Sequence, residues 1–346
     1  MSQTLEKVAA DVAAKPCTII EALNAALTDA MADDARVLVL GEDVADPEGG
    51  GVTGVTRGLS TRFGEKRVRS TPISEQAIIG AAIGASLAGF KPVAEIMLMN
   101  FTTVAMDMIV NHAAKLRYMS GGQTSVPLVI RTMTGAGYAS GGQHSDYLEA
   151  WFAHTPGMKV VAPSTTEDAY GLMRSAIDDP DPVLIIENLP TYRSTGARPT
   201  PGTRVPIGKA KVVREGRDIT IISYSRTMTE CRAAAAALAD AGVDAELIDL
   251  RTISPWDQET VLASVGKTGR CLIVHEAVVP FGAGAEIAAV VSERFFGKLK
   301  APVARVGAPF NPVPFSRPLE TAHVPSAEKV TQTALALVRG EGATAA

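Results

Sequence analysis

The sequence predicts an α/β protein whose sheets are mainly parallel. Short runs rich in Val, Ile and Leu alternate along the chain with longer helical patterns. Most of the short runs are apolar throughout, which is typical of strands covered by helices on both faces. The helical segments between them are long enough for the crossover that a parallel strand pair requires.

The elements follow in a regular order. The predicted strands are residues 36–40, 92–97, 127–133, 159–162, 182–187, 219–224, 245–250, 271–275 and 303–306. The predicted helices are residues 19–31, 75–88, 102–118, 166–177, 228–241, 256–265 and 283–296. Gly121 and Gly122 follow a basic stretch and predict the end of the helix over 102–118.

The length of 346 residues predicts two domains. Residues 191–207 are dense in Pro, Gly, Ser and Thr and lack periodicity, so we interpret them as a linker. The first domain then spans residues 1–190 and the second spans residues 208–346.

The composition narrows the class of protein. With 46% hydrophobic and 20% charged residues, the chain is typical of a soluble globular protein. A net charge of −4 without a basic stripe argues against nucleic acid as a partner. The longest uncharged stretch, 77–90, is too short to span a membrane, and the N-terminus lacks a signal-peptide core, so we expect a cytoplasmic protein. Cys17, Cys231 and Cys271 are far apart and odd in number, which predicts neither disulfides nor a zinc site.

Glu75 ends residues 71–75 (TPISE) and precedes the uncharged run 77–89 (AIIGAAIGASLAG). A carboxylate at the head of a buried helix points into the interior, where burial favours its protonated form unless a partner stabilises the anion. Such groups are frequent at functional sites. A glutamate in a first helical turn also complements the helix dipole without further function, and position alone leaves both interpretations open.

Two more candidates follow predicted strands. Phe101 comes after the strand 92–97, where an aromatic residue is either a core residue or a platform for a ligand. Residues 135–145 (GAGYASGGQHS) form a glycine-rich loop after the strand 127–133, at the strand end where α/β sheets bind ligands. His144 in this loop is the best acid–base candidate among five histidines, with a turn or capping role as the alternative.

Several motifs are absent. The glycine-rich loop is neither a P-loop nor a complete dinucleotide fingerprint. The chain also lacks HExxH and GxSxG, as well as a GDG followed by paired asparagines, the pattern with which a protein binds a diphosphate through a metal.

Together these residues resemble the β-subunit of the thiamine-diphosphate-dependent, decarboxylating component of 2-oxo acid dehydrogenase complexes. The resemblance extends from about Ile20 to about Arg339. It is carried by LGEDVA (40–45), TRGLSTRFGEKRV (56–68), TPISE (71–75), AAKLRYMSGG (113–122), GGQHS (141–145), EAWFAHTPGMKVVAPS (149–164), DPVLIIEN (181–188) and HEAVVPFGAGAEIA (275–288).

The resemblance implies a transketolase-like architecture with a pyrimidine-type thiamine-diphosphate-binding domain and a C-terminal transketolase-like domain. It also implies a heterotetramer, α2β2, in which the α-subunit holds the magnesium ion and the diphosphate while the β-subunit holds the aminopyrimidine. The missing diphosphate motif fits this division, and the chain should be inactive alone. The second partner is the lipoyl acyltransferase core, for which Glu286, Arg317 and Glu320 are polar docking candidates.

The resemblance also assigns functions to single residues. The Glu75 carboxylate would bond a ring nitrogen of the aminopyrimidine, and Phe101 would pack on that ring. His144 would face the reacting carbon and donate a proton during acyl transfer to the lipoyl group. Asp181 would contribute to a structural potassium site. The chain departs from the family's HSQS pattern, with Asp146 and Tyr147 after His144 and Ser145.

Members of the family act on pyruvate, branched-chain 2-oxo acids or acetoin. Residues 50–56 (GGVTGVT) and 131–137 (RTMTGAG) look more like acetoin dehydrogenase β-subunits. We therefore expect acetoin or pyruvate as the substrate. The alternatives are a branched-chain 2-oxo acid and a non-catalytic scaffold subunit of the same fold.

Overall fold

The computed structural model describes residues 15–341, and their backbone forms two compact units. The first unit contains residues 15–133 and 155–207, and the second contains residues 134–154 and 208–341. The chain thus leaves the first unit at residue 133, contributes residues 134–154 to the second unit, and returns to the first. The expectation for the N-terminal segment concerns residues 1–14, which lie outside the described range.

A parallel sheet forms the centre of the first unit. Its strands follow one another in the order β6-β7-β5-β4-β2-β3. Pairs β2–β3, β2–β4, β4–β5 and β6–β7 are parallel, as predicted. The bounds are β2 Val37–Gly41, β3 Val68–Ser70, β4 Lys91–Leu98, β5 Val129–Thr134, β6 Lys159–Val161 and β7 Val183–Asn188. A separate antiparallel pair joins β1 (Cys17–Thr18) to β8 (Thr195–Gly196).

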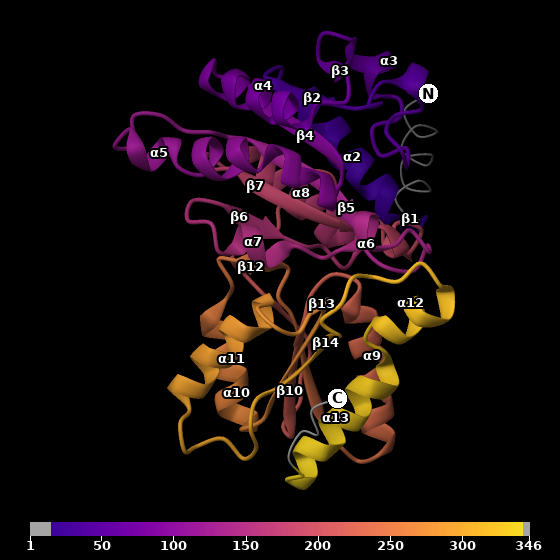
Figure 1. Ribbon diagram of the computed structural model, residues 1–346, viewed down its shortest axis with the longest axis vertical. Coiled ribbons are helices and arrows are strands. Elements are labelled where there is room, and N and C mark those ends of the chain that lie inside the picture. Colours follow the sequence, from indigo (N-terminus) through magenta and orange to yellow (C-terminus); the bar gives the residue numbers. More distant parts are fainter. Residues whose placement is uncertain (1–14, 342–346) are drawn as a thin grey trace, which may run out of the picture. The chain divides into compact units, whose positions relative to one another are not determined.

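Helices pack on this sheet. Helix α2 begins with a capping box: the Thr18 hydroxyl accepts a hydrogen bond from the Glu21 amide, and the Glu21 carboxylate accepts one from the Thr18 amide. Helix α2 packs along α8, and α4 packs against β4 (Figure 1). The bounds are α2 Ile19–Asp33, η1 Asp46–Glu48, α3 Leu59–Phe63, α4 Glu75–Leu87, α8 Thr166–Asp178 and η4 Leu189–Thr191.

The single helix predicted over 102–118 is wrong. The chain forms a 3-10 helix η2 (Met99–Ala105), a π-helix η3 (Met108–Ala113) and the short α5 (Leu116–Met119). The hydroxyls of Thr102 and Thr103 bond the carbonyl oxygens three residues earlier, a spacing that matches a 3-10 turn. The glycine stop is confirmed, because the amides of Gly121 and Gly122 bond carbonyls of the last turn.

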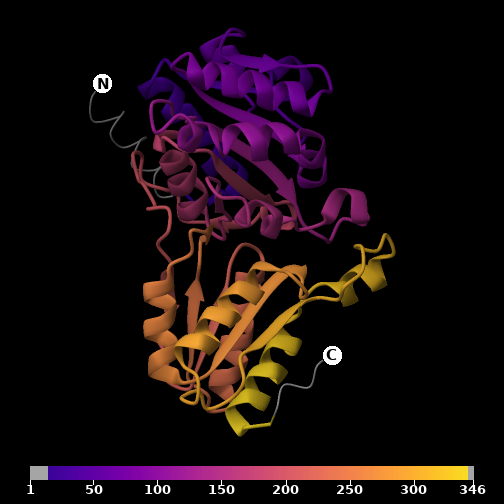
Figure 2. The same cartoon turned by 60° about the vertical axis from the view of Figure 1, so that its left-hand side comes forward.

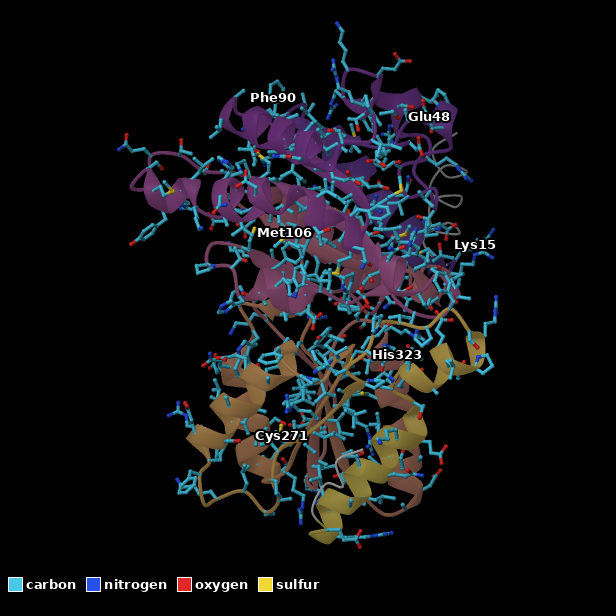
Figure 3. All side chains as sticks on the ribbon, in the orientation of Figure 1. Lys15, Glu48, Phe90, Met106, Cys271 and His323 are labelled. Carbon is cyan, nitrogen blue, oxygen red and sulfur yellow. The ribbon has the colours of Figure 1, made fainter. Side chains whose placement is uncertain are left out.

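The second unit contains a sheet in the order β14-β13-β10-β11-β9, in which only β9 is antiparallel to its neighbour. Helices α9 and α13 cover one face and α10 and α11 the other (Figures 1 and 2). Cys271 lies fully buried within these layers (Figure 3). The bounds are α6 Gly142–Ser145, α7 Glu149–Ala153, β9 Lys211–Arg214, β10 Ile219–Ser223, α9 Thr227–Asp240, β11 Ala245–Asp249, β12 Thr252–Ser254, α10 Gln258–Thr268, β13 Cys271–Val278, α11 Ala283–Arg294, β14 Ala304–Ala308, α12 Arg317–His323 and α13 Ala327–Arg339.

The segment interpreted as a linker is attached to the first unit. Val205 is 4% exposed and belongs to the same apolar core as α2 and α8. Its side chain fills the space beside Gly171, where a Cβ atom would overlap it. Among residues 15–341, we find no helix with the length and apolar character needed to cross a bilayer.

We predict that Gly157→Ala lowers the free energy of unfolding by about 3 kcal/mol. Gly157 has φ +98°, which costs an L-residue about 1–2 kcal/mol, and its Cβ would overlap the carbonyl oxygen of Ala114. Gly202→Ala is the matched control, because Gly202 also has positive φ but open space around it, and it should lose about 1 kcal/mol. Urea unfolding of both variants measures the difference, and equal losses would contradict the steric argument.

Candidate functional site

Glu75 is the first residue of α4, and its side chain is only 8% exposed. The sequence predicted this buried carboxylate at a helix start. A second carboxylate, Glu42, lies close to it and is 7% exposed. Burial raises the pKa of Glu42, and the carboxylates of Glu75 and Asp43 raise it further, while a hydrogen bond from the Ser74 amide opposes the shift.

Glu42, which follows β2, and Glu75, which begins α4, form a pair of buried carboxyl groups in the first unit. Burial and the neighbouring carboxylates both favour the protonated form of Glu42. One Glu42 oxygen, Oε1, is buried without a hydrogen-bond partner among the described residues. Sequence reasoning did not select Glu42 as a candidate, although it lies within LGEDVA and directly follows β2.

Phe101 lies in η2, which directly follows β4. Its ring is half-buried and packs against the apolar core of the first unit. Helix α4, which begins with Glu75, contacts both β4 and η2. The structure therefore brings together the two elements that carry Glu75 and Phe101, and together they offer a buried acceptor and apolar ring surface.

A buried ionic cluster crosses the sheet beside this region. The Arg131 guanidinium on β5 donates to Glu187 on β7, with Nε–Oε1 2.9 Å and Nη2–Oε2 2.6 Å, and to Glu95 on β4. The Tyr192 hydroxyl also donates to Glu187. Burial alone would lower the pKa of Arg131, but Glu187 and Glu95 more than offset this and hold it above its usual range. This cluster was not predicted from the sequence. The feature that indicates it is a charged residue inside each of three otherwise apolar strands.

The backbone at Gly51 shows why the stretch 50–56 has a glycine at this position. It has φ +77°, and a Cβ atom there would lie 3.1 Å from Oε1 of Glu95. A side chain at this position would crowd the buried carboxylate. This part of the pattern that favoured acetoin therefore lies directly against the ionic cluster.

His144 belongs to the second unit, whereas Glu75 and Phe101 belong to the first. It is exposed on α6, at the end of the glycine-rich loop. Three loop glycines, Gly135, Gly137 and Gly141, have positive φ, and so does Ala139 at +57°. A non-glycine residue in that conformation stores about 1–2 kcal/mol of strain, so the loop needs fixed contacts to keep its shape.

Beyond the loop, the second unit contains a cluster of buried titratable groups. The Tyr224 hydroxyl donates to Glu149 Oε1 at 2.8 Å, and the Tyr224 ring stacks on His275 with centroids 6.4 Å apart. Burial raises the pKa of Glu149 to about 7, although the Tyr224 hydrogen bond opposes this. Burial lowers the pKa of His275 to about 4. Both groups are therefore held mainly neutral at pH values where they would ionise in water.

Comparison with known proteins identifies the fold and the family. The family described as "Transketolase, pyrimidine binding domain" matches residues 15–195, and "Transketolase, C-terminal domain" matches residues 208–330. The chain is 43% identical over 335 residues to the acetoin:2,6-dichlorophenolindophenol oxidoreductase subunit beta of Cupriavidus necator, covering 94% of this chain and 99% of the relative. The chain belongs to this transketolase-like family of dehydrogenase β-subunits.

Further relatives of the β-subunit family agree. The corresponding Bacillus subtilis subunit is 40% identical, covering 94% of this chain and 98% of that one. The mitochondrial pyruvate dehydrogenase E1 subunit beta of Homo sapiens is 42% identical, covering 93% and 89%. A solved structure titled "Split gene transketolase, inactive beta4 tetramer" has a TM-score of 0.76 at 22% identity, covering 94% and 99%. The predicted fold class and family are confirmed.

The potassium contribution predicted for Asp181 stays a prediction. Asp181 forms ion pairs with Arg117 at 2.6 Å and Lys159 at 3.2 Å. Burial opposes ionisation of Asp181, but these two cations outweigh burial and lower its pKa. A metal ion at this carboxylate would compete with two fixed positive charges. The described residues contain no cluster of three or more His, Cys, Asp or Glu residues that could hold a metal ion.

We predict that Glu149→Gln changes how stability depends on pH. The folded pKa of Glu149, about 7, lies above its ordinary value of 4.5, so its stabilisation is full below 4.5 and is lost as pH rises through about 7. Relative to the native chain, the variant should gain about 3 kcal/mol between pH 4.5 and pH 8. Urea unfolding at several pH values measures this, with the exposed Glu293→Gln as the control. A pH-independent difference would contradict the assignment.

Proposed function

We propose that this chain is the β-subunit of a thiamine-diphosphate-dependent dehydrogenase component that acts with an α-subunit as α2β2 and delivers an acyl group to the lipoyl group of an acyltransferase. The observation that carries the proposal is the buried Glu42–Glu75 pair at the head of α4, on a pyrimidine-binding fold. Relatives named as beta subunits of an acetoin oxidoreductase and of pyruvate dehydrogenase E1, matched over nearly their whole length, support it.

The first unit supplies the aminopyrimidine half of the site. Glu75 accepts a hydrogen bond from a ring nitrogen, and Phe101 offers apolar surface to the ring. When bound, thiamine diphosphate supplies a centre that stabilises a carbanion at the substrate carbonyl carbon. We assign the magnesium ion and the diphosphate mainly to the α-subunit, because the sequence lacks the corresponding motif.

His144 serves the transfer step in this proposal. Its imidazole is exposed on a short helix, where the arm of a lipoyl group can approach it. Histidine is the side chain best suited to donate a proton near neutral pH. We propose that it gives a proton to the lipoyl sulfur that is released when the other sulfur receives the acyl group.

We propose acetoin or pyruvate as the substrate, with a branched-chain 2-oxo acid as the alternative. Identity does not separate the first two, since it is 43% to both the Cupriavidus necator acetoin subunit and the Drosophila melanogaster pyruvate subunit. The stretches 50–56 and 131–137 favour acetoin. We also propose a reducing cytoplasmic location, supported by three cysteines that are free and buried.

The test is co-expression of this chain with an α-subunit encoded in the same genome. The assay follows reduction of an artificial electron acceptor with thiamine diphosphate, offering acetoin, pyruvate and 2-oxoisovalerate separately, and each subunit alone is the control. Activity in the pair only is the expected result. Turnover by this chain alone would overturn the half-site proposal, and a pair that assembles without binding cofactor would favour a scaffold subunit.

We predict that Glu75→Gln lowers acceptor reduction by the pair about 10²-fold or more, because an amide cannot favour the required ring tautomer as a carboxylate does. The complex should still assemble. The control is Glu65→Gln, an exposed glutamate in the same unit. A Glu75→Gln enzyme that keeps most of its activity would exclude the assigned function.

We predict that His144→Ala lowers lipoyl-dependent turnover at least about tenfold more than it lowers acceptor reduction, because only the first reaction needs its proton. His154→Ala is the matched control, since His154 is also exposed and lies ten residues away, at the end of α7. Both reactions are measured on the same preparation. An unchanged ratio would refute the transfer function.

A further inference from the structure

Two buried carboxylates hold the backbone of the glycine-rich loop. Glu276 on β13 accepts a hydrogen bond from the Ala136 amide at 2.8 Å. Glu320 on α12 accepts hydrogen bonds from the amides of Gly137 at 2.6 Å and Ala139 at 3.0 Å. The two side chains are 6% and 3% exposed. Hydrogen bonds from amides to a carboxylate are among the stronger ones in proteins, so the backbone is held at residues 136, 137 and 139.

Arg226 completes this set of contacts. Its guanidinium donates to the carbonyl oxygen of Ala136 and lies 3.7 Å from Oε1 of Glu276. Both the amide and the carbonyl of Ala136 are therefore bound by charged side chains. Glu276, Glu320 and Arg226 all belong to the same unit as the loop.

Packing alone does not immobilise the loop. Ala139 keeps its strained φ of +57° while Glu320 binds its amide. Beside the loop lies a cavity of about 350 Å³, lined by Ala136, Tyr147, Val313 and His323 among others. His323 ends α12 (Figure 3). Because the cavity leaves space beside Ala136, packing does not hold the loop on that side, and the hydrogen bonds to Glu276 and Glu320 contribute to its shape.

Residues 312–316, which lead into α12, also contact the glycine-rich loop at Gly141 and Gly142, close to His144. A Cβ atom at Gly141 would overlap the Phe315 ring, and one at Gly142 would lie 3.0 Å from the Pro312 side chain. The Gly141 carbonyl in turn accepts a hydrogen bond from the His144 amide. Residues 312–320 therefore contact the loop at two places, through Glu320 at residues 137–139 and through Phe315 at residue 141.

These contacts correct one expectation. Glu320 was a polar candidate for docking the acyltransferase, but its carboxylate is buried and occupied by two loop amides. It is not available to a partner protein. A function inside the subunit fits it better.

We infer that Glu320 is a positioning residue for His144, acting through the loop backbone together with Glu276. The inference rests on the transfer function proposed for His144. Loss of the carboxylate would release the amides of residues 137 and 139, let the strained turn relax toward the cavity, and displace the imidazole. Misplacement of a reacting group by about 1 Å can lower a rate about 10²-fold.

The experiment uses the assembled α–β complex with Glu320→Leu, Glu320→Gln and the exposed control Glu293→Gln. The readout is the ratio of lipoyl-dependent turnover to acceptor reduction. We expect Glu320→Leu to lower this ratio about tenfold or more. Glu320→Gln should have a smaller effect, because its amide oxygen still accepts one hydrogen bond. The control should keep the native ratio.

A double variant separates positioning from general structural damage. If Glu320 acts through His144, adding Glu320→Leu to His144→Ala should change the ratio less than about twofold. If the double variant shows the product of the two single-variant losses in this ratio, the inference is overturned. A native ratio in Glu320→Leu would also overturn it. If Glu320→Leu does not assemble, the same comparison with Glu320→Gln decides.

The outcomes also separate this inference from the proposed function. A lowered ratio in His144→Ala with a native ratio in both Glu320 variants removes only the positioning inference. A native ratio in His144→Ala removes the transfer function, and the positioning inference with it. Hydrogen exchange provides an independent readout: the amides of residues 137 and 139 should exchange faster in the Glu320 variants but not in Glu293→Gln.

Discussion

The first unit depends on one buried guanidinium. Arg131 lies between Glu95 and Glu187 on the neighbouring strands β4 and β7, and Glu95 and Arg131 are direct register partners. Removing one member of such a cluster leaves an uncompensated buried charge and costs about 3–5 kcal/mol. Because a slip of one residue would turn every side chain to the opposite face, the cluster also fixes the strand register. That register sets where β4 ends before Phe101 and where β5 ends before the glycine-rich loop.

The chain handles its buried acids in two different ways. Glu95 and Glu187 share an arginine, and Glu276 and Glu320 accept hydrogen bonds from loop amides, so these carboxylates have charged or polar partners. Burial raises the pKa of Glu42 and Glu149, and it also raises that of Glu95 despite the ion pair with Arg131. The first arrangement is suited to holding backbone and strands in place. A raised pKa favours the protonated form of a buried carboxyl group, which is a property that acid–base chemistry uses.

Patterns of neighbouring residues in the sequence predicted the strands and most of the helices, but not the contacts between distant residues. The predicted strands are all present because their apolar runs are covered on both faces, and Glu75 heads a helix as its uncharged run indicated. The helix over 102–118 failed because two threonine hydroxyls tighten its start into a 3-10 turn. Helix α13 was missed although Ser326 caps it. The contact between Glu320 and the Gly137 amide joins residues 183 positions apart, a separation that no local pattern encodes.

The chain path places the loop that carries His144 in the second unit. The loop with His144 is joined covalently to the first unit at both ends, since residues 133 and 155 belong to that unit. Its backbone is nevertheless held by Glu276 and Glu320 of the second unit. A strained loop keeps its shape only while its contacts persist. The second unit therefore does more than complete the fold, because its buried carboxylates determine the conformation of the loop that carries His144.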